Sequence, residues 1–99
     1  DPPTAIFAAN DDTACGVLYE AAARGLRVPE QLSVFGFDDT PISRQVWPSL
    51  TTVRQPSREM GRIAAQQLIA AIDGHGPAHM VRVPYQLQIR HSTGPAPRR

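Results

Sequence analysis

The sequence predicts an α/β fold built around a βαβ unit whose two strands are parallel. Two apolar runs, at residues 4–10 and 32–37, are separated by a segment with helical periodicity. A connection of this kind between two buried strands requires a crossover, which is right-handed in nearly all proteins. With 99 residues, 41% of them hydrophobic and 19% charged, the chain has the composition of a small globular unit and not of a disordered segment.

The first strand and the helix after it carry clear local signals. The run TAIFAAN (residues 4–10) is apolar without alternation, as in a strand covered on both faces. Asn10 or Asp11 is a suitable N-cap for the helix that follows. Gly25 supplies the left-handed residue expected just after the end of that helix.

The second strand leads into a short helical turn. The run LSVFGF (residues 32–37) is predicted as a second buried strand. Thr40 as N-cap and Pro41 in the first helical position predict a turn of helix running toward Val46. The stretch WPSLTTV is then expected to be irregular and finally extended.

A second long helix and an extended segment complete the predicted elements. The helix is expected to begin near Ser57, capped by Ser57 or Gln55, and to end at Gly74. Its apolar positions form one stripe: Met60, Ile63, Ala64, Leu68, Ala71 and Ile72. Residues 80–90 are expected to be extended, and Pro84 interrupts them because proline cannot donate to a sheet ladder.

Acidic and amide side chains follow both predicted strands. Asn10, Asp11 and Asp12 come directly after the first strand, and Asp38 and Asp39 come after the second. Because parallel strands end at the same edge of a sheet, we expect these groups to converge at the carboxyl edge, where open α/β sheets bind ligands.

Capping is the alternative role for most of these acids. Asp11 or Asp12 could cap the long helix, and Asp39 could cap the turn at Thr40. Capping explains Asp38 poorly, because the next residue is better placed for it. We therefore interpret Asp38 as the functional acid.

Several catalytic chemistries lack their usual residues. A phospho-acceptor site with metal-binding acids normally uses a lysine, and all ten basic residues here are arginines. Neither G-x-G-x-x-G nor G-x-x-x-x-G-K-[ST] occurs, and no G-x-S-x-G occurs. His75, His79 and His91 have no metal-ligand spacing and are interpreted as surface residues. We expect no cofactor and no metal.

Two possibilities remain for the acids at the edge. A carboxylate pair for glycoside cleavage is not excluded by spacing alone. Reversible binding of a small polar molecule also fits, because Asp38 can accept hydrogen bonds from hydroxyl groups while the Asn10 amide both donates and accepts. The net charge of +1 gives no reason to expect direct contact with nucleic acid or membrane.

Three motifs together indicate a family. The stretches AIFAANDDTACG, RGLRVPEQLSVFGFDDTP and PSLTTVRQPSREMG occur in this order. With them the chain closely resembles the C-terminal part of the lactose/galactose repressor family of bacterial transcription regulators. The resemblance runs from about residue 4 to residue 93.

The resemblance implies a periplasmic-binding-protein-like type I fold, in which effector binds between two α/β subdomains. It assigns the chain to a C-terminal subdomain (4–52), a crossing (53–55), elements of the N-terminal subdomain (56–83), a return crossing with the last strand (84–91), and a tail (92–99). The helix from Ser57 and a strand at residues 80–83 would belong to the N-terminal subdomain.

The resemblance also implies roles for individual residues. Asn10, Asp38 and Gln55 match positions that contact effector in family members. Positions in regions where members pair as dimers are matched by Cys15, Leu18, Val46 and Trp47. For Leu18 and Trp47 the alternative is a place in the core of this chain, and Cys15 is interpreted as a small buried side chain.

The function implied is effector sensing and dimerisation within a cytoplasmic, DNA-binding transcription regulator that is not an enzyme. The partners would be a sugar or related metabolite, a second copy of the chain, and operator DNA, the last only through an N-terminal domain absent from this sequence. The alternatives are part of a periplasmic sugar-binding transport protein and, on the acids alone, a carbohydrate-active enzyme using Asp38 and Asp39.

Overall fold

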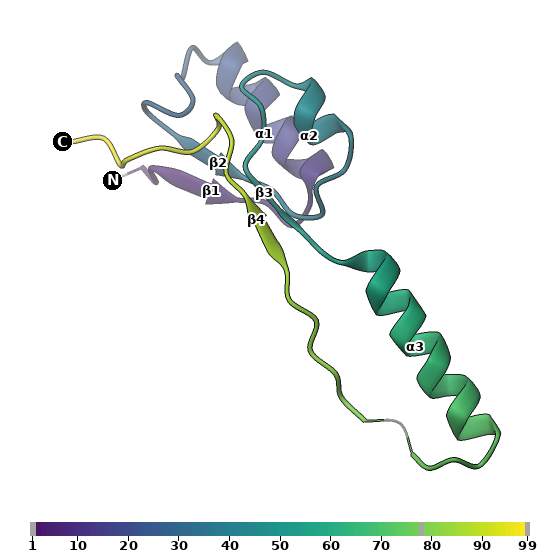
Figure 1. The fold of residues 1–99 in the computed structure, drawn as a ribbon. Coiled ribbons are helices and arrows are strands. Elements are labelled where there is room, and N and C mark those ends of the chain that lie inside the picture. Colours follow the sequence, from purple (N-terminus) through teal and green to yellow (C-terminus); the bar gives the residue numbers. More distant parts are fainter. Residues whose placement is uncertain (1, 78, 99) are drawn as a thin grey trace. The chain divides into compact units, whose positions relative to one another are not determined.

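The computed structural model describes residues 2–77 and 79–98 (Figure 1). The chain divides into two compact units: unit 1 is Asp1–Arg54 with Leu87–Arg99, and unit 2 is Gln55–Gln86. The fold is α/β, as the sequence predicts. In chain order the elements are β1 (Ala5–Phe7), α1 (Asp11–Ala23), β2 (Ser33–Phe35), α2 (Ile42–Gln45), β3 (Thr52–Arg54), α3 (Ser57–Ile72) and β4 (Gln86–Gln88).

Unit 1 contains the predicted βαβ unit. Strands β1 and β2 are parallel, with Ala5 opposite Ser33 and Phe7 opposite Phe35. Just past β1, the Ala8 amide donates to the Phe35 carbonyl at 2.8 Å. Strands β3 and β4 form a second pair, and an isolated parallel bridge joins Phe35 to Thr51. The prediction of parallel strands joined by a helix is confirmed.

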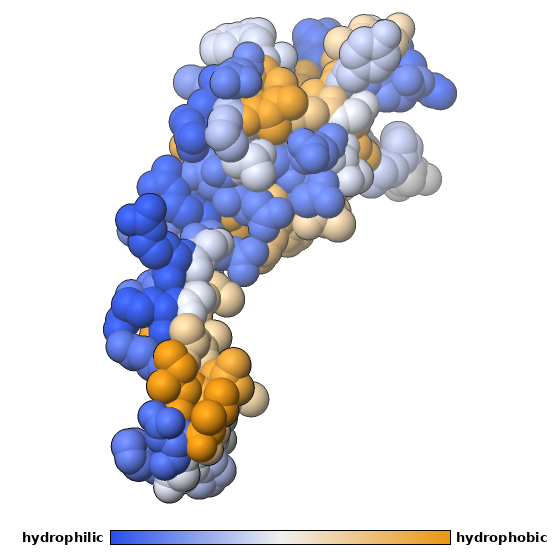
Figure 2. Space-filling view, turned by 90° about the vertical axis from the view of Figure 1, so that its right-hand side faces the viewer, coloured by the Kyte–Doolittle hydropathy of each residue, from blue (hydrophilic) through white to orange (hydrophobic). Residues whose placement is uncertain are grey.

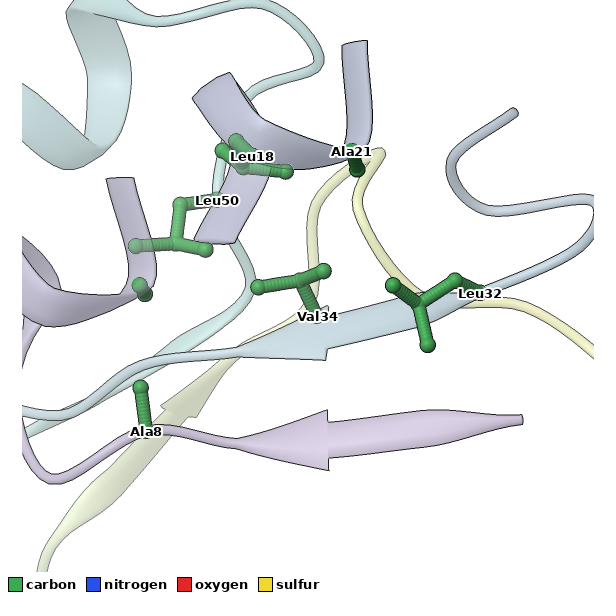
Figure 3. Close-up of a cluster of buried hydrophobic side chains, with 7 residues drawn as sticks. Ala8, Leu18, Ala21, Leu32, Val34 and Leu50 are labelled. Carbon is green, nitrogen blue, oxygen red and sulfur yellow. The ribbon is translucent and has the colours of Figure 1, made fainter. Parts of the chain in front are cut away.

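The core of unit 1 lies between α1 and the parallel strands (Figure 3). On α1 its residues are small or medium in size, which lets the helix backbone approach the sheet closely. Val34 from β2 and Leu50 from the segment before β3 are completely buried. The buried apolar residues are Ala8, Ala14, Leu18, Ala21, Leu32, Val34 and Leu50.

Helix α1 begins and ends as its sequence predicts. The Asn10 Oδ1 accepts a hydrogen bond from the Thr13 amide at 2.8 Å, which satisfies an unpaired donor of the first turn. At the other end Gly25 has φ +72°, and the Leu26 amide donates to the Ala21 carbonyl at 2.9 Å. This is the 6→1 bond of a Schellman motif.

Unit 2 consists of α3 and the extended segment after it. Apolar side chains gather on one face of this unit (Figure 2). A hollow in this unit is lined by Met60, Ile63, Ala64, Gln67, Val81 and Val83. No residue of α3 is fully buried, although the apolar stripe is present as predicted. The apolar face of α3 is therefore largely uncovered in this chain.

The ends of α3 agree with the prediction only in part. Gly74 has φ +80° and the His75 amide donates to the Ala70 carbonyl at 2.9 Å, so the predicted glycine stop is present. The expected polar cap is wrong: Pro56 occupies the N-cap position, and no side chain there caps the helix. Neither Ser57 nor Gln55 takes that role.

The extended segment gives two further corrections. Residues 80–83, expected to form a strand, carry no strand assignment in the structure. A strand needs a partner backbone, and the described part of unit 2 offers α3 instead. The last strand is Gln86–Gln88, whereas the family resemblance implies a last strand at residues 87–90.

The segment predicted as a tail begins with a residue built into the sheet. Ser92 is completely buried, and its hydroxyl donates to the Val34 carbonyl at 2.6 Å while accepting from the Thr51 amide at 2.8 Å. The Val34 amide in turn donates to the Ser92 carbonyl at 2.8 Å. Ser92 therefore fastens the end of the chain to β2 and to the start of β3.

No helix among the described residues is both long enough and apolar enough to span a membrane.

Candidate functional site

The carboxyl ends of β1 and β2 lie next to each other. The Asp11 amide donates to the Phe37 carbonyl at 3.0 Å, so the residues that follow β1 run beside those that follow β2. Asn10 and Asp38 are the neighbours of these two residues in the chain, and both are exposed. The structure thus brings an amide and a carboxylate to one edge of the sheet.

Asp11 is a structural acid. Its side chain is completely buried, and Oδ1 accepts from the Thr52 hydroxyl at 2.6 Å. Its Oδ2 accepts from both the amide and the hydroxyl of Thr40, at 2.7 and 3.2 Å. Asp11 therefore joins the end of β1, the turn after β2 and the start of β3.

These contacts correct the predicted start of the short helix. The Thr40 side chain donates to Asp11 and makes no capping bond, and Pro41 stands at the N-cap position of α2. The Thr40 hydroxyl donates to the buried Asp11 carboxylate, and hydrogen bonds to a charged acceptor are stronger than those between neutral groups.

Asp39 is a second structural acid, held by basic groups. Its side chain is fully buried, and Oδ2 accepts from Arg54 Nε at 2.7 Å. Its Oδ1 accepts from Arg90 Nη2 at 2.7 Å, Ser43 Oγ at 2.9 Å and Arg44 Nη1 at 3.1 Å. Burial by itself raises the pKa of Asp39, but the bonds from Arg90, Arg54 and Ser43 outweigh it and lower the pKa to about 2.

The turn that carries Asp38 and Asp39 has an unusual backbone. Asp38 has φ +111° and Asp39 has φ +58°, in a region that residues with a side chain seldom adopt. The Asp38 amide donates to the Val53 carbonyl at 2.9 Å, and the Asp39 amide donates to the Thr52 hydroxyl at 3.3 Å. Bonds to β3 therefore hold the turn in this conformation.

The remaining predicted effector contacts have different surroundings. Asn10 uses Oδ1 to cap α1, which leaves its amide nitrogen as the part suited to a ligand. Gln55 is half-buried and belongs to unit 2, directly after Arg54. It lines a shallow hollow together with Pro56, Ser57, Arg58 and Glu59.

The predicted dimer residues divide between core and surface. Leu18 lies in the core of unit 1, the alternative that the sequence left open for it, and Val46 packs against that core. Trp47 is 80% exposed, and its ring centroid lies 5.4 Å from that of His91.

Cys15 is half-buried on α1, next to the acids at the start of the helix. Burial raises the pKa of the Cys15 thiol, and the charges of Asp11 and Asp12 raise it further. Such a thiol is mostly protonated near neutral pH, in keeping with a small packed side chain and not a reactive nucleophile.

The contacts of Asp39 with Arg54 and Arg90 were not predicted from the sequence. Arg54 is 15 residues from Asp39 and Arg90 is 51 residues from it. No local pattern predicts such pairs; the only available signal is an arginine at the end of each of two extended segments. Within residues 2–77 and 79–98, no group of three or more His, Cys, Asp or Glu residues is arranged to hold a metal ion.

Most of the chain matches a known protein family. Residues 1–93 match the family described as "Periplasmic binding protein-like domain". The HTH-type transcriptional regulator DegA of Bacillus subtilis is 43% identical over 96 residues, which cover 94% of this chain and 28% of DegA. The chain therefore spans less than a third of the length of this relative.

Two solved structures of similar fold are transcription regulators. The transcriptional regulator CelR in complex with cellobiose has a TM-score of 0.83 and 36% identity, covering 90% of this chain and 28% of that chain. A dimeric Lac repressor with an 11-residue C-terminal deletion has a TM-score of 0.84 and 35% identity, covering 97% of this chain and 35% of that chain.

Proposed function

Because the chain belongs to the periplasmic-binding-protein-like domain family, in the form found in the lactose/galactose repressor family, we propose that it senses a small-molecule effector for a bacterial transcription regulator. The effector is a sugar or related metabolite, and CelR, a similar protein, is described as a complex with cellobiose. Operator DNA is reached through a separate DNA-binding domain, and the regulator acts in the cytoplasm, where that DNA lies.

The observation that carries this proposal is the contrast between three acids at one edge of the sheet. Asp11 and Asp39 are buried and bonded to groups that hold the fold together, whereas Asp38 is exposed. An exposed carboxylate on a backbone held by hydrogen bonds is suited to accept hydrogen bonds from ligand hydroxyl groups. Asn10 and Gln55 are the other two proposed contacts, each able to donate and accept.

The regulator acts as a homodimer in this proposal. Trp47 is the strongest candidate for a contact, because an indole ring this exposed supplies large apolar area to a partner. Cys15 would lie at the same interface, with Leu18 and Val46 packed beneath it. A solved relative, the Lac repressor, is described as dimeric, which supports this arrangement.

No catalytic role is assigned to Asp38 or Asp39. Asp39 is fully engaged by its arginines, so the acid pair required for glycoside cleavage is reduced to Asp38 alone. The relatives described above are transcription regulators and not transport proteins, which favours the regulator over a periplasmic sugar-binding protein.

Replacement of Asp38 in the full-length regulator tests the proposal. A panel of sugars and related metabolites is first screened by thermal shift, and the best binder is then titrated by calorimetry. Asp38→Asn should weaken its binding about 10- to 100-fold, because a hydrogen bond to a charged group contributes about 1.5–3 kcal/mol. Operator affinity without effector should remain near normal.

Glu30→Gln is the matched control. Glu30 is an exposed acid in the turn before β2, at the amino end of the strand, so its replacement should leave effector binding unchanged. Equal affinities in the Asp38→Asn variant and the wild-type protein would count against Asp38 as a ligand contact.

A further inference from the structure

The Asp39 carboxylate ties together segments that are distant in the sequence. It belongs to the turn after β2, next to Asp38. Its partner Arg54 is the last residue of β3 and the last residue of unit 1 before the chain enters unit 2. Its partner Arg90 follows β4, shortly after the chain has returned to unit 1 at Leu87. We call Asp39, Arg54 and Arg90 the Asp39 clamp.

Two of the three side chains of the clamp, Asp39 and Arg90, are largely buried. The Asp39 side chain is fully buried, and that of Arg90 is only 14% exposed. Arg90 Nη1 also donates to Ser43 Oγ and to the Leu50 carbonyl, both at 2.9 Å. A buried carboxylate is costly unless it is paired and hydrogen-bonded, so the loss of one arginine leaves a charge that the surroundings compensate less well.

The clamp acts on the same turn whose backbone is held against β3. Asp38 and Asp39 both have positive φ, and the Asp38 amide is bonded to Val53 within β3. The turn is therefore held twice: by its backbone amides, and by the side-chain bonds of Asp39. Loosening either connecting strand therefore removes a support from the residue that presents Asp38.

We propose that Asp39 is a positioning residue. Through its bonds to Arg54 and Arg90, it couples the Asp38 turn to the two segments that connect with unit 2, so that the turn and both segments undergo local opening together. A ligand that moves Asp38 would then move both connections together, and a motion of the connections would reach the ligand site. Only the assignment of a ligand to Asp38 rests on the proposed function; the mechanical coupling does not.

Hydrogen exchange on the full-length protein, without any ligand, tests the coupling. In the Arg90→Gln variant, exchange at the amides of Asp38 and Asp39 should rise by about 10-fold or more, although Arg90 touches neither amide. Exchange within α1, at Ala14 and Leu18, should stay close to the wild-type rate. Arg62→Gln, which breaks an exposed pair with Glu59 on α3, is the matched control and should change neither region.

A milder variant keeps the test decisive if Arg90→Gln folds poorly. Arg54 is 48% exposed, and Arg54→Gln removes a single bond to Asp39. In this variant the amides of Arg90 and His91, which donate to Thr51 Oγ1 and to the Ser49 carbonyl, should exchange faster. Increases confined to the mutated strand, or an equal increase throughout α1, would overturn the proposal.

The exchange experiment tests the clamp and the Asp38 titration tests the ligand contact, so either claim can be refuted without the other. If Asp38→Asn leaves effector binding intact but Arg90→Gln loosens the turn, the clamp stands and the proposed ligand contact falls. If the reverse holds, Asp38 binds effector on a turn that moves separately from the connecting strands.

Discussion

At the scale of single residues, environment and not residue type decides what an acid does at this sheet edge. Asp11 is surrounded by hydroxyl and amide donors, Asp39 by guanidinium groups, and Asp38 is exposed. All three follow strands, and the sequence allows a capping role for Asp11 and Asp39 but explains Asp38 poorly as a cap. In the folded chain Asp11 and Asp39 are buried and held by other segments, whereas Asp38 lies at the surface.

Asp39→Asn should lower the free energy of unfolding by about 2 kcal/mol at pH 7, since one unit of pKa shift corresponds to about 1.4 kcal/mol. The pKa of Asp39 is lowered from 3.8 to about 2 in the folded chain, so its stabilising effect is complete above pH 3.8. It is lost as the pH falls through 2, because the folded state then binds the proton too. Urea unfolding followed by circular dichroism at several pH values measures the difference.

The pH dependence separates this ionic contribution from a packing defect. The free energies of unfolding of Asp39→Asn and the wild-type protein should converge toward pH 2. A difference in stability that is the same at every pH would contradict an ionic contribution from Asp39. Glu59→Gln, at an exposed pair on α3, should show little effect at any pH.

Residue roles were predictable where the determinants are local. Asn10 could be assigned as a helix cap because its partner, Thr13, lies three residues away. The same local reasoning misplaced Thr40, whose side chain is taken by Asp11, 29 residues away. Arg90 could not be assigned at all, because only the fold brings it to Asp39.

At the scale of elements, a glycine directly after β2 lets the backbone pass close to Asp11 at the start of α1 and to Leu50. A Cβ added at Gly36 would collide with Asp11 Oδ1 and lie 2.8 Å from Leu50 Cδ2. Gly36→Ala should therefore destabilise the fold by about 1–3 kcal/mol, as overpacking in a well-packed core does. Thermal or urea unfolding of the variant measures this.

A glycine on the exposed face of α1 gives the opposite expectation. A Cβ at Gly16 meets nothing within 4 Å, so Gly16→Ala should stabilise the chain by about 0.5–1 kcal/mol through helix propensity alone. A stabilising change in both variants would show that the tight contact at Gly36 is relieved by movement of Asp11 or Leu50.

The glycine stops of the helices followed the sequence, whereas the predicted caps of α2 and α3 and the strand at residues 80–83 did not. Gly25 and Gly74 both stop helices as predicted, since a left-handed residue is a local requirement. The strand expected at residues 80–83 is absent from the structure, because strand formation depends on a neighbouring backbone and not on apolar residues alone. The pairing of β3 with β4 likewise depends on residues more than 30 positions apart.

At the scale of the whole molecule, both units leave apolar surface uncovered. In unit 1, Phe7 is 67% exposed and Ile89 is 74% exposed. In unit 2, α3 buries no residue completely. Exposed apolar patches on a small protein mark places where another polypeptide segment packs.

These 99 residues, expressed alone, should self-associate or exchange segments between copies, because uncovered apolar faces are stabilised by any complementary surface. Sedimentation velocity over a range of concentrations measures this. The full-length regulator, at the same concentrations, serves as the reference and should give one defined dimer. A single monomeric species from the isolated 99 residues would contradict the expectation.

The guanidinium groups of the Asp39 clamp have a consequence for chemical control. Arginine keeps its charge at every pH a cell reaches and is not a substrate for amine acetylation, and this sequence contains no lysine. Amine-directed enzymes and cross-linking reagents therefore find no side chain to modify here. Lysine acetylation, which removes a positive charge, therefore cannot weaken the pairing of Asp39 with its arginines.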